Sequence, residues 1–463
     1  MKTVVLNGSP KGDVSVTLQY VQFIQKKFPQ HELKIFNVVP HIKALERDAA
    51  AFQAIVDEVH AADGVLWAFP LYVMLVHAGY KRFIELVFER GAQESFRGKC
   101  AAVLTTSIKF YDHTAHDYMH SICDDLDMKY VGGYSAAMYD LQQAPEQERL
   151  LGFAADFMDA IDSRRPTVKA HLPLAWRAPD YTPGPATHQV ATGKRKVLVI
   201  TDAEAGQANL LRMIERFRAA FSAPVEVVNL HDVDIKGGCL GCLRCGYDNR
   251  CAYEGKDGFI EFYRTKVQTA DLVVFAGAIR DRYLSATWKN YFDRRFFNTH
   301  QFTLPGRQIG YLVSGPLAQI ANLRQMLTAL VDLERANLVG IVTDEPADSA
   351  AIDAQLDTLA AGLVRAAERG YVAPPTFLQV GGMKIFRDDI WGHMRVAFQA
   401  DHRAYRRQGI YDFPQYDYRT RAQNALFGLL LRIPRVRREF QKQIKTGMIA
   451  PLKKVVDALP SGN

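Results

Sequence analysis

The sequence predicts an α/β protein made of two tandem, doubly wound parallel sheets of five strands each, followed by a mainly helical C-terminal extension. Strand-like and helix-like segments alternate in two series, and a proline-rich stretch separates the series. A chain of 463 residues has room for two or three domains. Its 48% hydrophobic and 23% charged residues are an ordinary globular composition, which excludes a disordered chain.

The first series contains short apolar runs at residues 3–6, 33–37, 64–68, 101–106 and 130–134. The segments between them have helical spacing, as in Phe52, Ile55, Val56 and Val59. Strands separated by single helices form right-handed βαβ units and therefore a parallel sheet.

Five prolines at 166, 173, 179, 183 and 185 favour an extended linker. A second series of strands is predicted at residues 196–201, 226–229, 272–276, 308–314 and 338–343. Residues 62–67 (ADGVLW) align with 270–275 (ADLVVF), and 81–84 (KRFI) with 289–292 (KNYF), so we infer an internal duplication. The predicted limits are 1–163 for the first domain, 164–194 for the linker, 195–373 for the second domain and 374–463 for the extension.

The net charge of +7 is concentrated in the tail, where residues 381–463 hold 16 Lys and Arg against seven Asp and Glu. These cations alternate with Leu and Phe, which does not indicate nucleic-acid binding. A basic amphipathic helix within 426–456 either docks on the protein's own core or contacts an anionic membrane or a partner protein. The N-terminus runs directly into a strand and no apolar run has membrane-spanning length, so we expect a cytoplasmic protein.

A candidate phosphate-binding loop, residues 8–17 (GSPKGDVSVT), joins the first strand to the first helix. Free backbone N–H groups and the positive helix end favour an anion there, and Ser9, Lys11, Ser15 and Thr17 add hydroxyls and a charge. The loop is neither a Walker A motif nor GxGxxG. A simple helix-capping turn explains this loop equally well when it is considered alone.

A second loop, residues 69–73 (FPLYV), follows the third strand at the sheet edge where open α/β sheets bind ligands. Together, GSPK…SVT and ADGVLWAFPLYVMLVHAGYKRFIE resemble the flavodoxin-like NADPH-dependent FMN reductases and the related iron–sulfur flavoproteins. The resemblance implies that FMN binds the first domain, with its phosphate on Ser9, Lys11, Ser15 and Thr17 and its ring on Pro70, Leu71, Tyr72 and Val73. The loop beginning at Thr106 and Ser107 would close the site. Val16 and Met74 depart from the family's usual Asn and Gly.

The second domain differs from the first in the residues at its phosphate-loop position and in its cysteines. Asp202 and Glu204 occupy its phosphate-loop position, and Arg280 stands where the family has Tyr, so its flavin site is degenerate. It carries instead four cysteines at Cys-x2-Cys-x2-Cys-x5-Cys spacing: Cys239, Cys242, Cys245 and Cys251. This compact spacing resembles the cysteine motif of the iron–sulfur flavoproteins and predicts a [4Fe-4S] cluster. A zinc ion and free thiols are the alternatives.

The predicted function is an oxidoreductase that passes electrons from NAD(P)H or ferredoxin to a small organic acceptor through FMN and the cluster, which face each other in an intramolecular pseudo-dimer. A homodimer is a further option. Lys109, Tyr111 and His113, after the fourth strand, and Arg280 are the candidate catalytic residues. The alternatives are an FMN or quinone reductase without a cluster, and a non-catalytic electron carrier that docks at a membrane or a partner protein.

Overall fold

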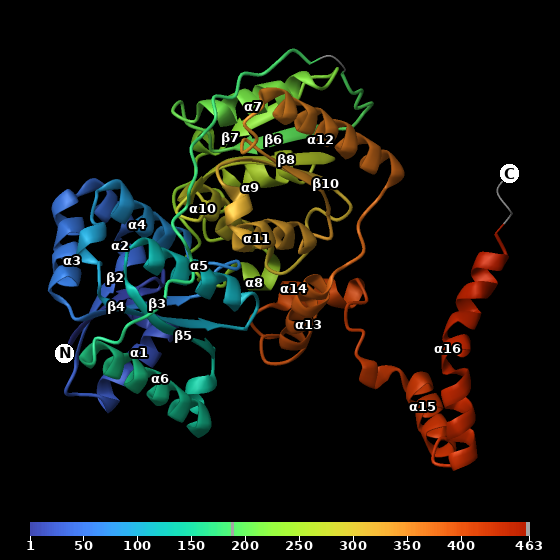
Figure 1. The fold of residues 1–463 in the computed structure, drawn as a ribbon, viewed down its shortest axis with the longest axis horizontal. Coiled ribbons are helices and arrows are strands. Elements are labelled where there is room, and N and C mark those ends of the chain that lie inside the picture. Colours follow the sequence, from blue (N-terminus) through green and yellow to red (C-terminus); the bar gives the residue numbers. More distant parts are fainter. Residues whose placement is uncertain (187–188, 460–463) are drawn as a thin grey trace. The chain divides into compact units, whose positions relative to one another are not determined.

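The computed structural model describes residues 1–186 and 189–459, which form two compact units, Met1–Ala404 and Tyr405–Asn463. The first unit contains two parallel sheets, in the blue and in the green-to-yellow part of the chain (Figure 1). The predicted fold class is confirmed, including the helical C-terminal region. The predicted domain limits stay a prediction.

The first sheet has the strand order β2-β1-β3-β4-β5, with all strands parallel. Its strands are β1 Lys2–Asn7, β2 Glu32–Asn37, β3 Gly64–Pro70, β4 Cys100–Ser107 and β5 Lys129–Ala137. Its helices are α1 Val16–Lys27, α2 Val38–Arg47, α3 Ala49–Ala61, α4 Ala78–Glu89, α5 Asp112–Asp125 and α6 Ala144–Asp162.

The second sheet repeats this order as β7-β6-β8-β10-β11. Its strands are β6 Val197–Thr201, β7 Glu226–Asn229, β8 Leu272–Arg280, β10 Gln308–Ser314 and β11 Asn337–Thr343, and a short sixth strand, β9 Tyr283–Leu284, pairs antiparallel with the end of β8. Its helices are α7 Ala208–Ala219, α8 Cys245–Asp248, α9 Phe259–Phe262, α10 Ala286–Arg294, α11 Ala321–Asp332 and α12 Ser349–Arg369. The repeated order is what a duplicated domain predicts.

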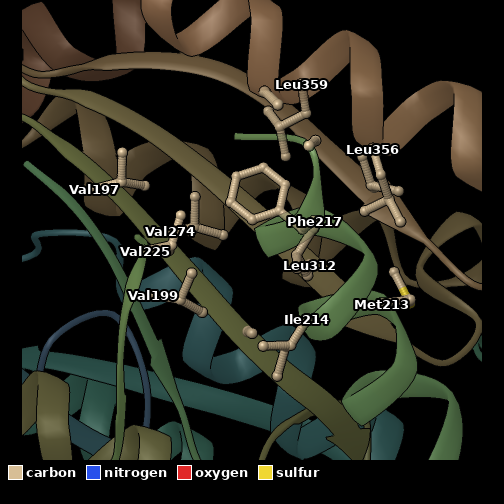
Figure 2. Close-up of a cluster of buried hydrophobic side chains, with 14 of the residues drawn as sticks. Val197, Val199, Met213, Ile214, Phe217, Val225, Val274, Leu312, Leu356 and Leu359 are labelled. Atoms are coloured by element: carbon tan, nitrogen blue, oxygen red, sulfur yellow. The ribbon is translucent and has the colours of Figure 1, made fainter. Parts of the chain in front are cut away.

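The core of the second domain shows why these segments form central strands. Val197 and Val199 on β6 and Val274 on β8 are buried beneath Phe217 of α7 and Leu359 of α12 (Figure 2). Since helices cover parallel strands on both faces, the strands are continuously apolar and do not alternate. In the first domain, α1 and α6 cover the equivalent face of the sheet.

The two domains meet where α4 packs against α10. The first N–H of each helix is bound by a carboxylate of the other: Ala78 N donates to Asp293 Oδ2 at 2.8 Å, and Ala286 N donates to Glu85 Oε1 at 2.7 Å. Buried lysines four residues earlier neutralise these carboxylates within the same helices. A carboxylate at a helix N-terminus is favourable. The reciprocal contact therefore gives the paired copies an approximate twofold relation.

After the second sheet come α13 Phe377–Trp391, α14 Gln399–Arg407, α15 Tyr418–Leu430 and α16 Pro434–Asp457. The rings of Phe427 on α15 and Phe440 on α16 pack edge to face, with centroids 5.6 Å apart. No helix within residues 1–186 and 189–459 is long and apolar enough to cross a membrane. Contact of the basic helix with a membrane or a partner stays a prediction.

Candidate functional site

A cavity of about 410 Å³ lies at the C-terminal edge of the first sheet. Four strand-end loops of the first domain, after β1, β3, β4 and β5, line it, and so does the cysteine loop of the second domain. Nine of the ten predicted flavin-binding residues line this cavity: Ser9, Lys11, Ser15, Pro70, Leu71, Tyr72, Val73, Thr106 and Ser107. The tenth, Thr17, is buried below them, and its hydroxyl shares a hydrogen bond of 2.6 Å with Thr106 Oγ1.

The loop after β1 has the local geometry of an anion site. Asn7 at the strand end accepts from Ser9 N at 3.1 Å and donates to the carbonyl of Gly12, which adopts a left-handed φ of 54°. Ser15 caps α1 by accepting from Leu18 N, and the first turn of this helix has no acidic residue. Hydroxyls and a helix N-terminus thus line the cavity, whereas the one carboxylate of this loop, Asp13, does not line it and accepts from Asn37 Nδ2 at 2.8 Å, so the residues fit a phosphate group.

The corresponding loop of the second domain does not fit a phosphate. Asp202 is buried there, burial raises its pKa, and it binds the Ser285 hydroxyl. Glu204 forms an ion pair with Arg280 at 3.0 Å. None of these four residues lines the cavity.

The loop after β3 forms a flat wall of the cavity. Tyr72 and Leu75 exchange backbone hydrogen bonds of 2.8 and 3.0 Å, which closes a tight turn with positive φ at Val73 and Met74. Burial raises the pKa of the Tyr72 phenol, so the ring stays neutral. A Cβ added to Gly241 would overlap the Tyr72 hydroxyl, so this wall lies directly against the cysteine loop.

His77 connects the same wall to the cysteine loop. Its Nδ1 accepts from Gly79 N at 3.0 Å as the cap of α4, and its Nε2 lies 2.9 Å from the carbonyl oxygen of Cys239. Since Nδ1 is an acceptor, Nε2 carries the hydrogen and donates it. Burial lowers the pKa of His77, which favours this neutral form. His77 lies within the motif of residues 62–85, but nothing in that motif predicted a role for it.

All four predicted metal ligands line the cavity: Cys239, Cys242, Cys245 and Cys251. They are free thiols; Cys245 is buried, Cys239 and Cys251 are half-buried and Cys242 is exposed. Burial raises the pKa of Cys239 and that of Cys245 to about 12; the charge of Asp293 and then the neighbouring thiols add to this effect at Cys239, and the neighbouring thiols alone add to it at Cys245. Among the described residues, no group of three or more His, Cys, Asp or Glu side chains is placed to hold a metal ion. The zinc alternative and the metal-binding prediction therefore gain no support.

A third part of the wall comes from segments that carry no motif. Phe296, Phe297 and His300 follow α10, and Phe386 and Phe398 belong to the extension. The ring of Phe110, in the loop after β4, packs against Phe386 with centroids 4.3 Å apart. The extension therefore closes the cavity on the side of the first domain.

The four predicted catalytic residues do not line the cavity. Lys109 Nζ binds Ser135, and the buried Tyr111 packs against Phe110. His113 Nε2 lies 3.3 Å from Gln325 of α11. Arg280 pairs with Glu204 and Glu89, outside the cavity. Their catalytic role stays a prediction that this geometry does not favour.

Comparison with known proteins identifies the first domain. Residues 1–141 match the family model of the NADPH-dependent FMN reductases. This match confirms the resemblance stated above and the prediction of an NAD(P)H-dependent flavin oxidoreductase. It gives no support to an iron–sulfur cluster or to ferredoxin as the donor. No curated protein matches the chain.

Solved structures similar to this chain include an NADH:FMN oxidoreductase (EMOB), at 17% identity over 34% of this chain and 89% of that chain, with a TM-score of 0.30. The flavoenzyme NAD(P)H:(acceptor) oxidoreductase FerB from Paracoccus denitrificans is 20% identical over 35% of this chain and 98% of its own, with a TM-score of 0.28. An FMN-dependent NADH-azoreductase from Bacillus anthracis str. Ames Ancestor is 12% identical over 35% of this chain and 98% of its own, with a TM-score of 0.27.

Proposed function

We propose that the protein is an NAD(P)H:acceptor oxidoreductase that binds FMN in the cavity shared by the phosphate loop, the Tyr72 wall and the cysteine loop. The observation that carries this proposal is that these three parts, far apart in sequence, line one cavity. Bound FMN supplies hydride transfer between NAD(P)H and a small organic acceptor. The protein positions both reactants and keeps water from the ring.

The phosphate of FMN would be held by Ser9, Lys11 and Ser15 at the N-terminus of α1. Lys11 provides the positive side chain of this loop, and the two hydroxyls add directed hydrogen bonds. Pro70 and Tyr72 would lie against the ring of FMN. Because the buried Tyr72 phenol is neutral, it can cover this ring without the cost of burying a charge.

The finer proposal concerns the cysteine loop. The four cysteines lie within thirteen residues of the chain, and all of them line the same cavity. A zinc ion needs four sulfurs within about 2.3 Å of one atom, and the described residues form no such group. We propose Cys239, Cys242, Cys245 and Cys251 as cluster ligands because their compact spacing resembles that of the iron–sulfur flavoproteins, with free thiols as the alternative.

The test of FMN binding is titration of the protein with FMN, combined with NADPH oxidation in the presence of an acceptor. Lys11→Met should weaken FMN binding at least tenfold, because a hydrogen bond to a charged group contributes about 1.5–3 kcal/mol. Lys26→Met is the matched control, since Lys26 is exposed on α1, the helix that follows this loop, and does not line the cavity. Equal FMN affinities for the two variants would contradict the phosphate site.

The test of the cluster is iron and sulfide analysis after anaerobic purification. We expect about four irons per chain, lost in Cys245→Ser and kept in Cys100→Ser, because Cys100 is buried away from the cavity and bonded to the Ala160 carbonyl. An FMN-loaded protein without iron would refute the cluster and support the alternative, a flavin reductase with free thiols. A colourless protein that binds no FMN would refute the whole proposal.

A further inference from the structure

A histidine that is bonded to a buried carboxylate forms part of the cavity wall that the flavin motifs do not explain. His300 lines the cavity, and its Nδ1 lies 2.7 Å from Oδ2 of Asp401 on α14. Asp401 is fully buried and also accepts from the Thr299 hydroxyl and from the backbone N–H of His300. Three donors thus hold one carboxylate in place, which fixes the plane of the imidazole.

The surroundings of this pair are aromatic. The ring centroid of His300 lies 4.4 Å from that of Phe386, 4.8 Å from that of Phe398 and 5.2 Å from that of Phe296. All three phenylalanines line the cavity. Phe386 also packs on Phe110, in the loop that follows β4 of the flavin-binding domain. An apolar aromatic subsite that contains His300 therefore adjoins the predicted flavin site; its rings are inclined, at 43° between His300 and Phe386, 65° between His300 and Phe398 and 83° between His300 and Phe296.

We propose that His300, oriented by Asp401, is the catalytic proton donor to the acceptor, a planar conjugated carbonyl compound bound among Phe296, Phe386 and Phe398. This inference rests on the proposed function, which supplies the hydride. A carbonyl acceptor that gains a hydride equivalent also needs a proton on oxygen. A carboxylate that holds the Nδ1 proton stabilises the imidazolium and directs the opposite nitrogen, Nε2, to the transfer.

The step balances as follows. NAD(P)H supplies a hydride equivalent through the flavin and leaves as NAD(P)⁺. The hydride equivalent brings the electron pair and forms the O–H bond at one carbonyl oxygen of a quinone. The Nε2–H bond of the His300 imidazolium breaks, and its proton forms the O–H bond at the other oxygen, so the quinone becomes a hydroquinone. A proton from water then restores the imidazolium. Asp401 keeps its charge throughout and is a positioning residue.

The kinetic test compares two oxidants of the reduced, FMN-loaded protein. Reduction of 1,4-benzoquinone consumes protons, whereas reduction of ferricyanide transfers only electrons. His300→Gln should slow the benzoquinone reaction on the order of 100-fold and leave flavin reduction by NADPH and the ferricyanide reaction unchanged. His60→Gln is the matched control, because His60 is exposed on α3 and does not line the cavity.

The second readout is independent of activity. In the NMR spectrum of ¹⁵N-histidine-labelled protein, the Nδ1 proton shared with Asp401 should give a low-field signal in the wild type and in His60→Gln. His300→Gln and Asp401→Asn should both lose it. Asp401→Glu should retain the signal and most of the benzoquinone rate, which a purely structural role of Asp401 does not predict.

The outcomes separate the two proposals. Normal flavin reduction with an unchanged benzoquinone rate in His300→Gln overturns the assignment of His300 and leaves the proposed function intact. Equal slowing of the benzoquinone and ferricyanide reactions also overturns it, since proton donation cannot explain both. A wild-type protein that binds no FMN overturns the proposed function and this inference with it.

Discussion

Gly241 offers the sharpest test of how the two domains share one cavity. It has a left-handed φ of 60°, and a methyl group at its Cα would overlap the Tyr72 hydroxyl and lie 3.2 Å from Cε of Lys11. Gly241→Ala therefore has two separate effects. The backbone conformation costs about 1–2 kcal/mol for any L-residue, and the Tyr72 hydroxyl must retreat by roughly 1 Å to reach normal contact distance.

Gly255→Ala isolates the first effect. Gly255 lies in the same segment with a φ of 72°, and a Cβ there would meet nothing within 4 Å. Urea unfolding should show a loss of about 1–2 kcal/mol for both variants. Only Gly241→Ala should also weaken FMN binding, by at least about tenfold or 1.4 kcal/mol, because only there does the ring wall move. Equal FMN dissociation constants for the two variants would refute the shared cavity.

Three further changes test the interface, the acid response and the predicted role of Arg280. Lys289→Met leaves the fully buried Asp293 carboxylate without its ion-pair partner, so urea unfolding should show a loss of about 3–5 kcal/mol. Burial raises the pKa of Asp257, but the hydrogen bonds and charge of Arg294 outweigh burial and hold this pKa below its usual range. The ion pair therefore stabilises the folded protein above about pH 4, and this stabilisation is lost as the pH falls further. Asp257→Asn should flatten the plot of unfolding free energy against pH in that range. Arg280→Gln should leave FMN affinity and NADPH oxidation within about twofold, because its ion pairs lie outside the cavity.

Each of these changes has a clear contrary result. Arg218→Met removes an exposed ion pair with Glu215 and should cost no more than about 1 kcal/mol; a similar cost for Lys289→Met would mean that the buried pair contributes little. Parallel acid profiles for the wild type and Asp257→Asn would show that another group controls acid unfolding. A large loss of NADPH oxidation in Arg280→Gln would restore this residue to the catalytic site.

The strands were predictable from sequence because burial on both faces requires continuous apolar runs. All ten predicted runs are strands, and their limits differ at the ends, as where β8 continues beyond Ala276 to Arg280. β9 was missed because a two-residue strand, Tyr283–Leu284, has no period to detect. The loop after β1 was equally predictable from sequence, since its turn residues and its helix cap are neighbours in the chain.

The rest of the site could not be predicted because it depends on how the two domains pack. His113 follows β4 as expected, but α11 of the second domain packs beside it and places Gln325 at its ring. In an isolated first domain, the same histidine would stand at an open sheet edge. His300 and Asp401, in contrast, are about a hundred residues apart and belong to no motif.

The approximate twofold relation explains why such a site is asymmetric. The helices α4 and α10 exchange equivalent carboxylates, so the contact that joins the copies is nearly symmetric. The loops around this axis differ between the copies. One example is His77 of the first copy, which binds the Cys239 carbonyl of the second. In a symmetric pair of identical chains, each loop has the same sequence at both of the equivalent sites. A duplicated chain lacks this restriction. One copy can therefore keep the phosphate loop while the other contributes cysteines and phenylalanines to the same cavity.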